Sequence, residues 1–98
     1  MSHRLIVRPK AENDIRRAYR WYETELEGLG MRFLRELDEG FEKISANPRH
    51  YAEIAGGIRR KLLNKFPYGV FFVFEDQEVR VLAVSQHAQN PDVWKSRR

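Results

Sequence analysis

Residues 58–86 read IRRKLLNKFPYGVFFVFEDQEVRVLAVSQ and contain three strand candidates. The run VFFVF at 70–74 consists only of β-branched and aromatic residues, which is typical of a strand covered on both faces. A short polar segment joins it to the apolar run at 79–84, so the two runs are predicted to form an antiparallel hairpin. Turn residues at 66–69 connect it in the same way to a basic strand at 58–63. The sequence therefore predicts a three-stranded meander with residues 70–74 at its centre.

The first half of the chain predicts one strand and two helices. Residues 4–8 form a short strand candidate that Pro9 ends, and Pro9 itself suits the first position of a helix. A second helical pattern starts near Met31 and should stop at Asn47, because the following proline disfavours helical geometry there. A short glycine-containing linker separates the helices, so they are expected to lie antiparallel as a hairpin.

The first helix is predicted to bury one apolar stripe. Its members recur at spacings of three and four: Ala11, Ile15, Ala18, Tyr19, Tyr22 and Leu26. Asp14 is assigned to the first turns, where a carboxylate complements the positive end of the helix dipole. Tyr19 and Tyr22 could stack on bases, but their spacing favours the core. Trp21 lies off the stripe and is a candidate for an interaction surface.

The remaining segments complete the architecture. Residues 49–57 are interpreted as a connector rich in turn residues, and Asn90-Pro91-Asp92 is a helix-start signal for one terminal turn in which Trp94 packs back on the core. The whole chain, residues 1–98, is thus predicted to be a single α+β domain of order β-α-α-β-β-β. Its helical hairpin should cover a small, mainly antiparallel sheet of three or four strands, with the N-terminal strand at one side.

Composition restricts the function classes. The 98 residues include no cysteine, which excludes disulfides and thiolate metal sites, and no histidine pair has metal-ligand spacing, so no metal is expected. The sequence also lacks a glycine-rich phosphate loop, and no other cofactor is expected. Membrane-spanning and signal-peptide patterns are missing, and a cytoplasmic protein is expected. The formal net charge of +4 favours an anionic partner such as nucleic acid, the ribosome or an acidic protein segment. A basic surface that is merely solvated is the alternative.

Several short segments occur in the order of a known family: Val7-Arg8-Pro9-Lys10-Ala11, Leu29-Gly30, Asn47-Pro48, Ile58-Arg59-Arg60, Phe66-Pro67-Tyr68 and Val81-Leu82-Ala83-Val84. Together they resemble the RelE/ParE superfamily of bacterial toxins from type II toxin–antitoxin pairs, also labelled plasmid stabilisation proteins. Within that family, RelE-like toxins cut messenger RNA at the ribosomal A site, whereas ParE-like toxins inhibit DNA gyrase. The long hairpin and the Phe66-Pro67-Tyr68 turn are more similar to the ParE side.

The resemblance implies a growth-inhibiting toxin that a cognate antitoxin neutralises. The toxin is expected to form a homodimer or a toxin–antitoxin hetero-oligomer. A ParE-like inhibitor of DNA gyrase, with no catalytic chemistry, is the favoured interpretation. One alternative is a RelE-like, ribosome-dependent mRNA endonuclease, an mRNA interferase. The other is a degenerate member that retains only antitoxin binding.

Cleavage of RNA by its own 2′-hydroxyl requires a base, an acid and cations that hold the phosphate. The candidates for these roles are Arg59, Lys61, Arg80 and His87. Period-two alternation is expected to place Arg59, Lys61 and Lys65 on one face of their strand, and Arg80 joins them if its face matches. Cations on an edge strand also prevent edge-to-edge aggregation, so this role is an open alternative.

The end of the last strand departs from the nuclease pattern. In many relatives a histidine occupies the register of Gln86, and here His87 is displaced by one residue, which turns a strand side chain to the opposite face. A plain surface histidine is therefore the alternative for His87. Ala88-Gln89 stand where a basic pair is common in the family. These departures favour a gyrase inhibitor or a degenerate member over a ribonuclease.

A ParE-like toxin would depend on binding surfaces. Residues expected to contact the antitoxin or the target are Arg59, Lys61, Lys65, Trp21, Trp94, Arg97 and Arg98. The antitoxin is expected to wrap the domain with a segment that folds on binding, placing apolar side chains on the sheet or hairpin and acidic ones on the strand cations. The basic, partly helical C-terminal tail is expected to contact gyrase.

Overall fold

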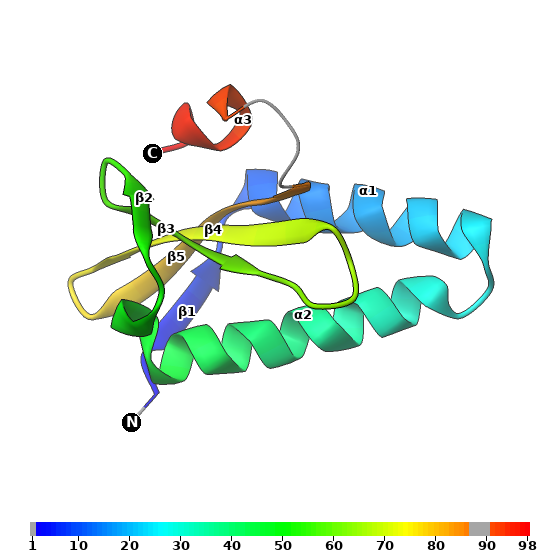
Figure 1. Ribbon diagram of the computed structural model, residues 1–98, viewed down its shortest axis with the longest axis horizontal. Helices are drawn as coiled ribbons and strands as arrows, with labels where there is room; N and C mark the ends of the chain where they lie inside the picture. Colours follow the sequence, from blue (N-terminus) through cyan, green and yellow to red (C-terminus); the bar gives the residue numbers. More distant parts are fainter. Residues whose placement is uncertain (1, 87–90) are drawn as a thin grey trace.

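The computed structural model describes residues 2–86 and 91–98 (Figure 1). Its elements are β1 (Arg4–Val7), α1 (Pro9–Glu25), α2 (Leu29–Ala46), the 3₁₀ turn η1 (Pro48–His50), β2 (Glu53–Ala55), β3 (Ile58–Leu62), β4 (Tyr68–Glu75), β5 (Glu78–Gln86) and α3 (Asp92–Lys95). The predicted elements occur in the predicted order, with β2 in addition, and the helical hairpin is confirmed. Among the described residues, no helix combines the length and the apolar character needed to cross a bilayer.

The sheet has the strand order β1-β5-β4-β3-β2, with β1 parallel to β5 and all other neighbours antiparallel. β4 is the central strand and β1 an edge strand, as predicted. The expectation of three or four strands is wrong, because three residues of the predicted connector pair with β3 as β2. Gly56 and Gly57 make the intervening turn with φ values of +52° and +83°, which non-glycine residues rarely adopt.

A β-bulge in β5 changes which of its residues face the helices. Phe71 pairs with Ala83 but Phe72 pairs with Val81, so Leu82 is an extra residue on β5. Strict alternation therefore breaks at Leu82. Val81 packs with the helices, whereas Leu82 and Ala83 both belong to the cluster on the opposite face.

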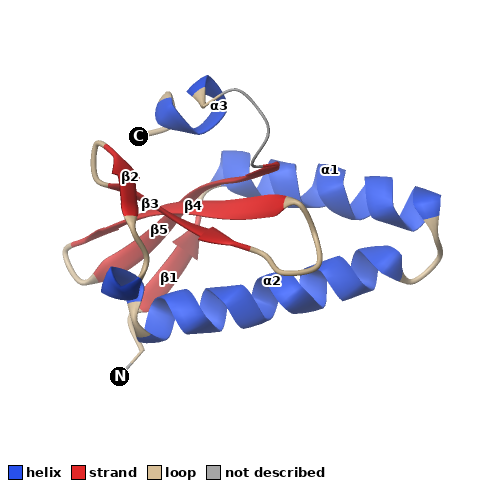
Figure 2. Ribbon diagram, viewed as in Figure 1, coloured by secondary structure: helices blue, strands red, loops and turns tan. Residues whose placement is uncertain are grey.

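Two apolar cores lie on opposite sides of the sheet. Figure 2 shows the strands between α2, below them, and the short helix α3, above them. The larger core joins the hairpin to the sheet and includes Phe33, Leu37 and Phe72. The smaller one lies under α3, where the Trp94 ring stacks on Phe71 with ring centroids 4.9 Å apart and an interplanar angle of 14°. Trp94 is only 9% exposed, so the prediction that it packs back on the core is confirmed.

The hairpin turn is tighter than predicted, because α2 begins at Leu29 and Gly30 is a helical residue. A Cβ atom at Gly30 would lie 2.8 Å from the backbone oxygen of Tyr19, so glycine permits the close approach of the two helices. The Glu23 carboxylate accepts the Gly30 N–H at 2.8 Å and satisfies one of the free donors at the start of α2. Leu26 follows the end of α1 in an extended conformation and is 59% exposed, so its assignment to the buried stripe is wrong.

Candidate functional site

Arg59 and Lys61 share one face of β3, as the alternation predicted, and in the structure this face is turned to the helices. They pair across the ladder with the core residues Phe72 and Val70. Arg59 donates a hydrogen bond to the backbone oxygen of Tyr51 at 2.7 Å, and the Lys61 ammonium lies 5.4 Å from the Tyr51 ring centroid. Both half-buried cations therefore hold the segment before β2 against the sheet.

Lys65 does not share this face, because β3 ends at Leu62 and the alternation ends with it. Lys65 lies in the loop between β3 and β4, where its N–H donates to the two Glu36 carboxylate oxygens at 3.2 and 3.3 Å. The N–H of Asn64 donates to the same carboxylate. Glu36 thus fastens the loop to α2 and leaves the Lys65 side chain exposed.

Arg80 lies on the opposite side of the sheet from Arg59 and Lys61. It pairs with Val73, which belongs to the core under α3. Its guanidinium is 2.8 Å from Glu78, 3.8 Å from Glu75 and 3.9 Å from Asp76. Arg80 is therefore neutralised by carboxylates and does not join the cations of β3.

Asp14 is a buried carboxylate that connects three parts of the chain. It is 6% exposed, and it accepts hydrogen bonds from the Val84 N–H at 3.0 Å, from Arg97 at 2.5 Å and from Arg17 at 2.6 Å. The dipole role assigned from the sequence missed this arrangement. Its spacing of three from Ala11 and four to Ala18 placed it on the buried stripe and could have indicated burial.

The C-terminal candidates are engaged within the domain. Trp94 is stacked on Phe71, Arg97 is bound to Asp14 and to the Leu82 carbonyl oxygen at 3.2 Å, and Arg98 contacts Glu75 at 2.5 Å. The hydrogen bond from Arg98, assisted by the charges of Arg98 and Arg80, lowers the pKa of Glu75. Contacts of these residues with a partner stay a prediction.

The remaining candidates from the sequence are His87 and Trp21. His87 lies outside the described residues, as does Asn90 of the predicted helix start. Trp21 is 58% exposed on α1, which confirms that it lies off the buried stripe. Across residues 2–86 and 91–98, His, Asp and Glu side chains form no group of three that could hold a metal ion.

An apolar groove runs between the two helices of the hairpin, with a volume of about 400 Å³. This hairpin groove has a floor of Ile15, Tyr19, Met31 and Leu34, and Arg16 and Arg20 stand beside it. The sequence analysis assigned Ile15 and Tyr19 to the buried stripe, but both are only half-buried, and Met31 is exposed. The groove was not predicted because the exposure of a stripe depends on how far the helices separate.

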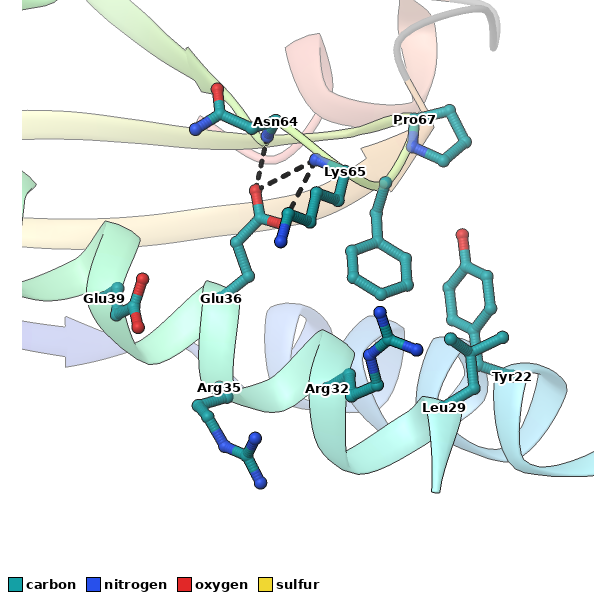
Figure 3. A pocket seen from close by; sticks show the side chains of 10 residues that line it. Tyr22, Leu29, Arg32, Arg35, Glu36, Glu39, Asn64, Lys65 and Pro67 are labelled. Carbon is teal, nitrogen blue, oxygen red and sulfur yellow. Dashed lines mark hydrogen bonds between the residues drawn. The ribbon is translucent and has the colours of Figure 1, made fainter. Parts of the chain in front are cut away.

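A second hollow, of about 430 Å³, lies between α2 and the β3–β4 loop (Figure 3). The apolar part of this loop cleft is formed by Tyr22, Leu29, Phe66 and Pro67, and its polar part includes Arg32, Arg35, Glu36, Glu39 and Lys65. Burial raises the pKa of Tyr22, and the neighbouring Tyr68 adds to this effect. Of the binding residues predicted from the sequence, Lys65 lines this cleft.

Comparison with known proteins finds a family model that matches most of the chain. The model of a family described as the ParE toxin of the type II toxin–antitoxin system parDE matches residues 5–91. No curated protein sequence matches the chain.

Solved structures share the fold. A chain from the chromosomal ParDE toxin–antitoxin system of P. aeruginosa superposes with a TM-score of 0.77 at 17% identity, covering 87% of this chain and 96% of that one. A mutant of the E. coli toxin RelE in the free state gives 0.73 at 17% identity, covering 99% and 95%. The RelBE2 toxin–antitoxin complex from Mycobacterium tuberculosis gives 0.62 at 16% identity, covering 89% and 100%. At these identities the likeness shows the fold alone.

Proposed function

Because this chain belongs to the ParE toxin family of type II toxin–antitoxin systems, we propose that it inhibits growth by binding DNA gyrase and is neutralised by a cognate antitoxin. The match to the ParE model supports the gyrase target. We favour binding over RNA cleavage because the candidate cations are separated in the structure, whereas a ribonuclease would have to bring them together.

Phosphate chemistry needs cations that converge on the position where negative charge develops. Here Arg59 and Lys61 are turned to Tyr51, and Arg80 is held by carboxylates on the other side of the sheet. Each of these cations therefore interacts with groups of the domain itself. This arrangement supports a protein that acts through its surface.

The hairpin groove supports the antitoxin half of the proposal. An amphipathic helix binds a groove of this kind through apolar residues at spacings of three and four. The Met31 side chain and the half-buried Tyr19 and Leu34 offer that apolar floor, while Arg16 and Arg20 favour acidic residues on the edge of the incoming helix. An antitoxin segment that is disordered alone and folds on the toxin would fit this surface.

Two assays separate gyrase inhibition from RNA cleavage. Purified protein is added to a gyrase supercoiling reaction and, separately, to translating ribosomes, with messenger cleavage mapped by primer extension. We expect loss of supercoiling and no cleavage within codons. A general acid or base contributes about 10²–10⁴-fold in rate, so the loss of such a group would be evident. If the protein has none, His87→Ala should leave growth inhibition nearly intact.

The opposite pattern would replace the proposal. Codon-specific cleavage that disappears in His87→Ala, with supercoiling untouched, would identify a ribonuclease. The antitoxin is expected to be the product of the neighbouring reading frame. A protein that lacks both activities but still binds this product would be a degenerate member.

A further inference from the structure

The loop cleft carries cationic side chains that have no partner within the described part of the domain. Arg32 and Arg35 project from exposed positions one turn apart on α2, and Lys65 projects from the loop. Within residues 2–86 and 91–98, none of these three side chains forms a hydrogen bond or an ion pair. Figure 3 shows the Arg32 guanidinium pointing into the cleft on the side of Tyr22 and Leu29, whereas Arg35 points away from the loop.

The acidic residues of the cleft leave this charge available. Glu36 is occupied by the backbone N–H groups of Asn64 and Lys65, which satisfy its oxygens. Glu39 stands at the opposite end of the cleft from Tyr22 (Figure 3). The end near Tyr22 therefore combines an unpaired guanidinium with an apolar wall.

That wall is rigid and aromatic. The rings of Tyr22 and Phe66 meet edge-to-face with centroids 4.8 Å apart, and both rings also pack against Phe33 of the main core. A preformed wall of this kind accepts a large apolar side chain at a low cost in conformational entropy.

We propose that the loop cleft is a second docking point for the antitoxin, separate from the hairpin groove. A large apolar side chain of the antitoxin lies against Tyr22 and Phe66, and a neighbouring carboxylate pairs with Arg32. The inference rests on the proposed antitoxin binding. The apolar wall beside Arg32 suits a large apolar side chain with a carboxylate next to it, which a peptide offers and a phosphate chain does not. The net charge of +4 disfavours a second copy of this chain, so an acidic peptide segment is the occupant.

One antitoxin segment can reach both sites. Met31 and Leu34 of the groove directly precede Arg32 and Arg35 of the cleft in the sequence, so the two sites lie on adjacent sides of α2. A helix with its side chains is about 10–12 Å across, which an extended chain spans in about three to four residues. The antitoxin should therefore carry an amphipathic helix and, a few residues away, an apolar residue flanked by acidic ones. Two linked contacts also raise the affinity above that of either alone.

Charge reversal tests the cleft against the groove. The purified toxin is titrated calorimetrically with the purified product of the neighbouring reading frame. The cleft variant carries Arg32→Glu with Arg35→Glu, the groove variant Arg16→Glu with Arg20→Glu, and the control Arg8→Glu with Lys10→Glu. All six residues are exposed, and all three variants change the charge equally. We expect the cleft variant to weaken binding about tenfold or more, the control by less than about threefold, and the difference to shrink at high salt.

The apolar contact has its own measurement. Ring-proton NMR signals of Tyr22 and Phe66 should shift when the antitoxin binds the wild-type toxin, and circular dichroism should show that each variant is folded. If charge reversal unfolds the cleft variant, Arg32→Gln with Arg35→Gln replaces it.

Each outcome separates the two proposals. A cleft variant that binds like the control, while the groove variant is weakened, rejects the second docking point and keeps the antitoxin partner. A wild-type toxin that does not bind the neighbouring gene product rejects both. Ring signals that stay unchanged on binding reject the apolar contact.

Discussion

Asp14 shows what a single residue does in this domain. Its carboxylate, on the first helix, holds the backbone of β5 through Val84 and the C-terminal segment through Arg97. A buried carboxylate is tolerated only when its charge is paired and hydrogen-bonded. The spacing in the sequence could have indicated the burial of Asp14, but its partner could not be predicted, because Arg97 is separated from it by 83 residues.

Arg97→Ala is expected to destabilise the protein clearly. The change leaves a buried carboxylate with one remaining cation, Arg17, and should lower the free energy of unfolding by about 3 kcal/mol, the low end for breaking a buried ion pair. Arg98→Ala is the matched control, because the exposed Arg98 pairs at the surface with Glu75 and such pairs contribute little. Urea unfolding measures both variants. Equal stabilities of Arg97→Ala and Arg98→Ala would contradict the role of Asp14.

The helical hairpin depends on a glycine at the point where its two helices meet. In Gly30→Ala, the new Cβ would lie 2.7 Å from the Cγ of Glu23 and 2.8 Å from the Tyr19 backbone oxygen, so the helices must separate. Overpacking of this kind costs about 1–3 kcal/mol, which is at least as large as the gain of about 1 kcal/mol from the better helix propensity of alanine. The melting temperature of Gly30→Ala should therefore fall.

Gly40→Ala on the same helix is the control. A Cβ atom at Gly40 would meet its nearest neighbour, the Lys61 Cε, at 3.5 Å, which is an ordinary contact. Without a clash, the propensity gain of about 1 kcal/mol should raise the melting temperature or leave it unchanged. A fall of similar size in both variants would indicate that helical glycine matters here for a reason other than the approach to Tyr19.

Elements with a strong local pattern were predictable, and those that depend on a partner were not. The run at 70–74 is recognised by its continuous apolar composition and the two helices by the spacing of their apolar residues. Both signals are local in the sequence, and all three elements are confirmed. β2 has three residues and becomes a strand only by pairing with β3. The bulge at Leu82 likewise arises from the pairing of β5 with β4, and it is the reason that alternation alone could not assign the residues of β5 to faces.

The distinction between local pattern and pairing also explains the outcome for the site. Arg59 and Lys61 share a face because both lie within β3, whereas Lys65 lies beyond its end. The groove and the cleft arise where separate elements meet: α1 with α2, and α2 with the β3–β4 loop. Neither hollow has a signature in a single segment, so the sequence could supply their cations but not their shape.

The whole domain consists of two cores of unequal size that share one sheet. β4 contributes to both, since Phe72 packs under the hairpin and Phe71 under Trp94. It is also hydrogen-bonded on both edges, to β3 and to β5. The covering on the α3 side is a single short helix, and β2 is an edge strand that pairs only with β3 among the described residues. Stability should therefore be highest at β4 and lower at β2 and α3.

Native-state hydrogen exchange measures this distribution residue by residue. Amides of residues 70–74 should exchange only through global unfolding, because releasing β4 opens both cores. Amides of residues 53–55 and of α3 should exchange faster through local opening, since β2 can leave one edge and α3 one face while the hairpin core persists. Trp94→Ala should speed exchange in α3 far more than in α1, because it removes the stacking contact with Phe71 and leaves the hairpin core intact. Faster exchange at 70–74 than at 49–57 would show that β4 is not the central strand.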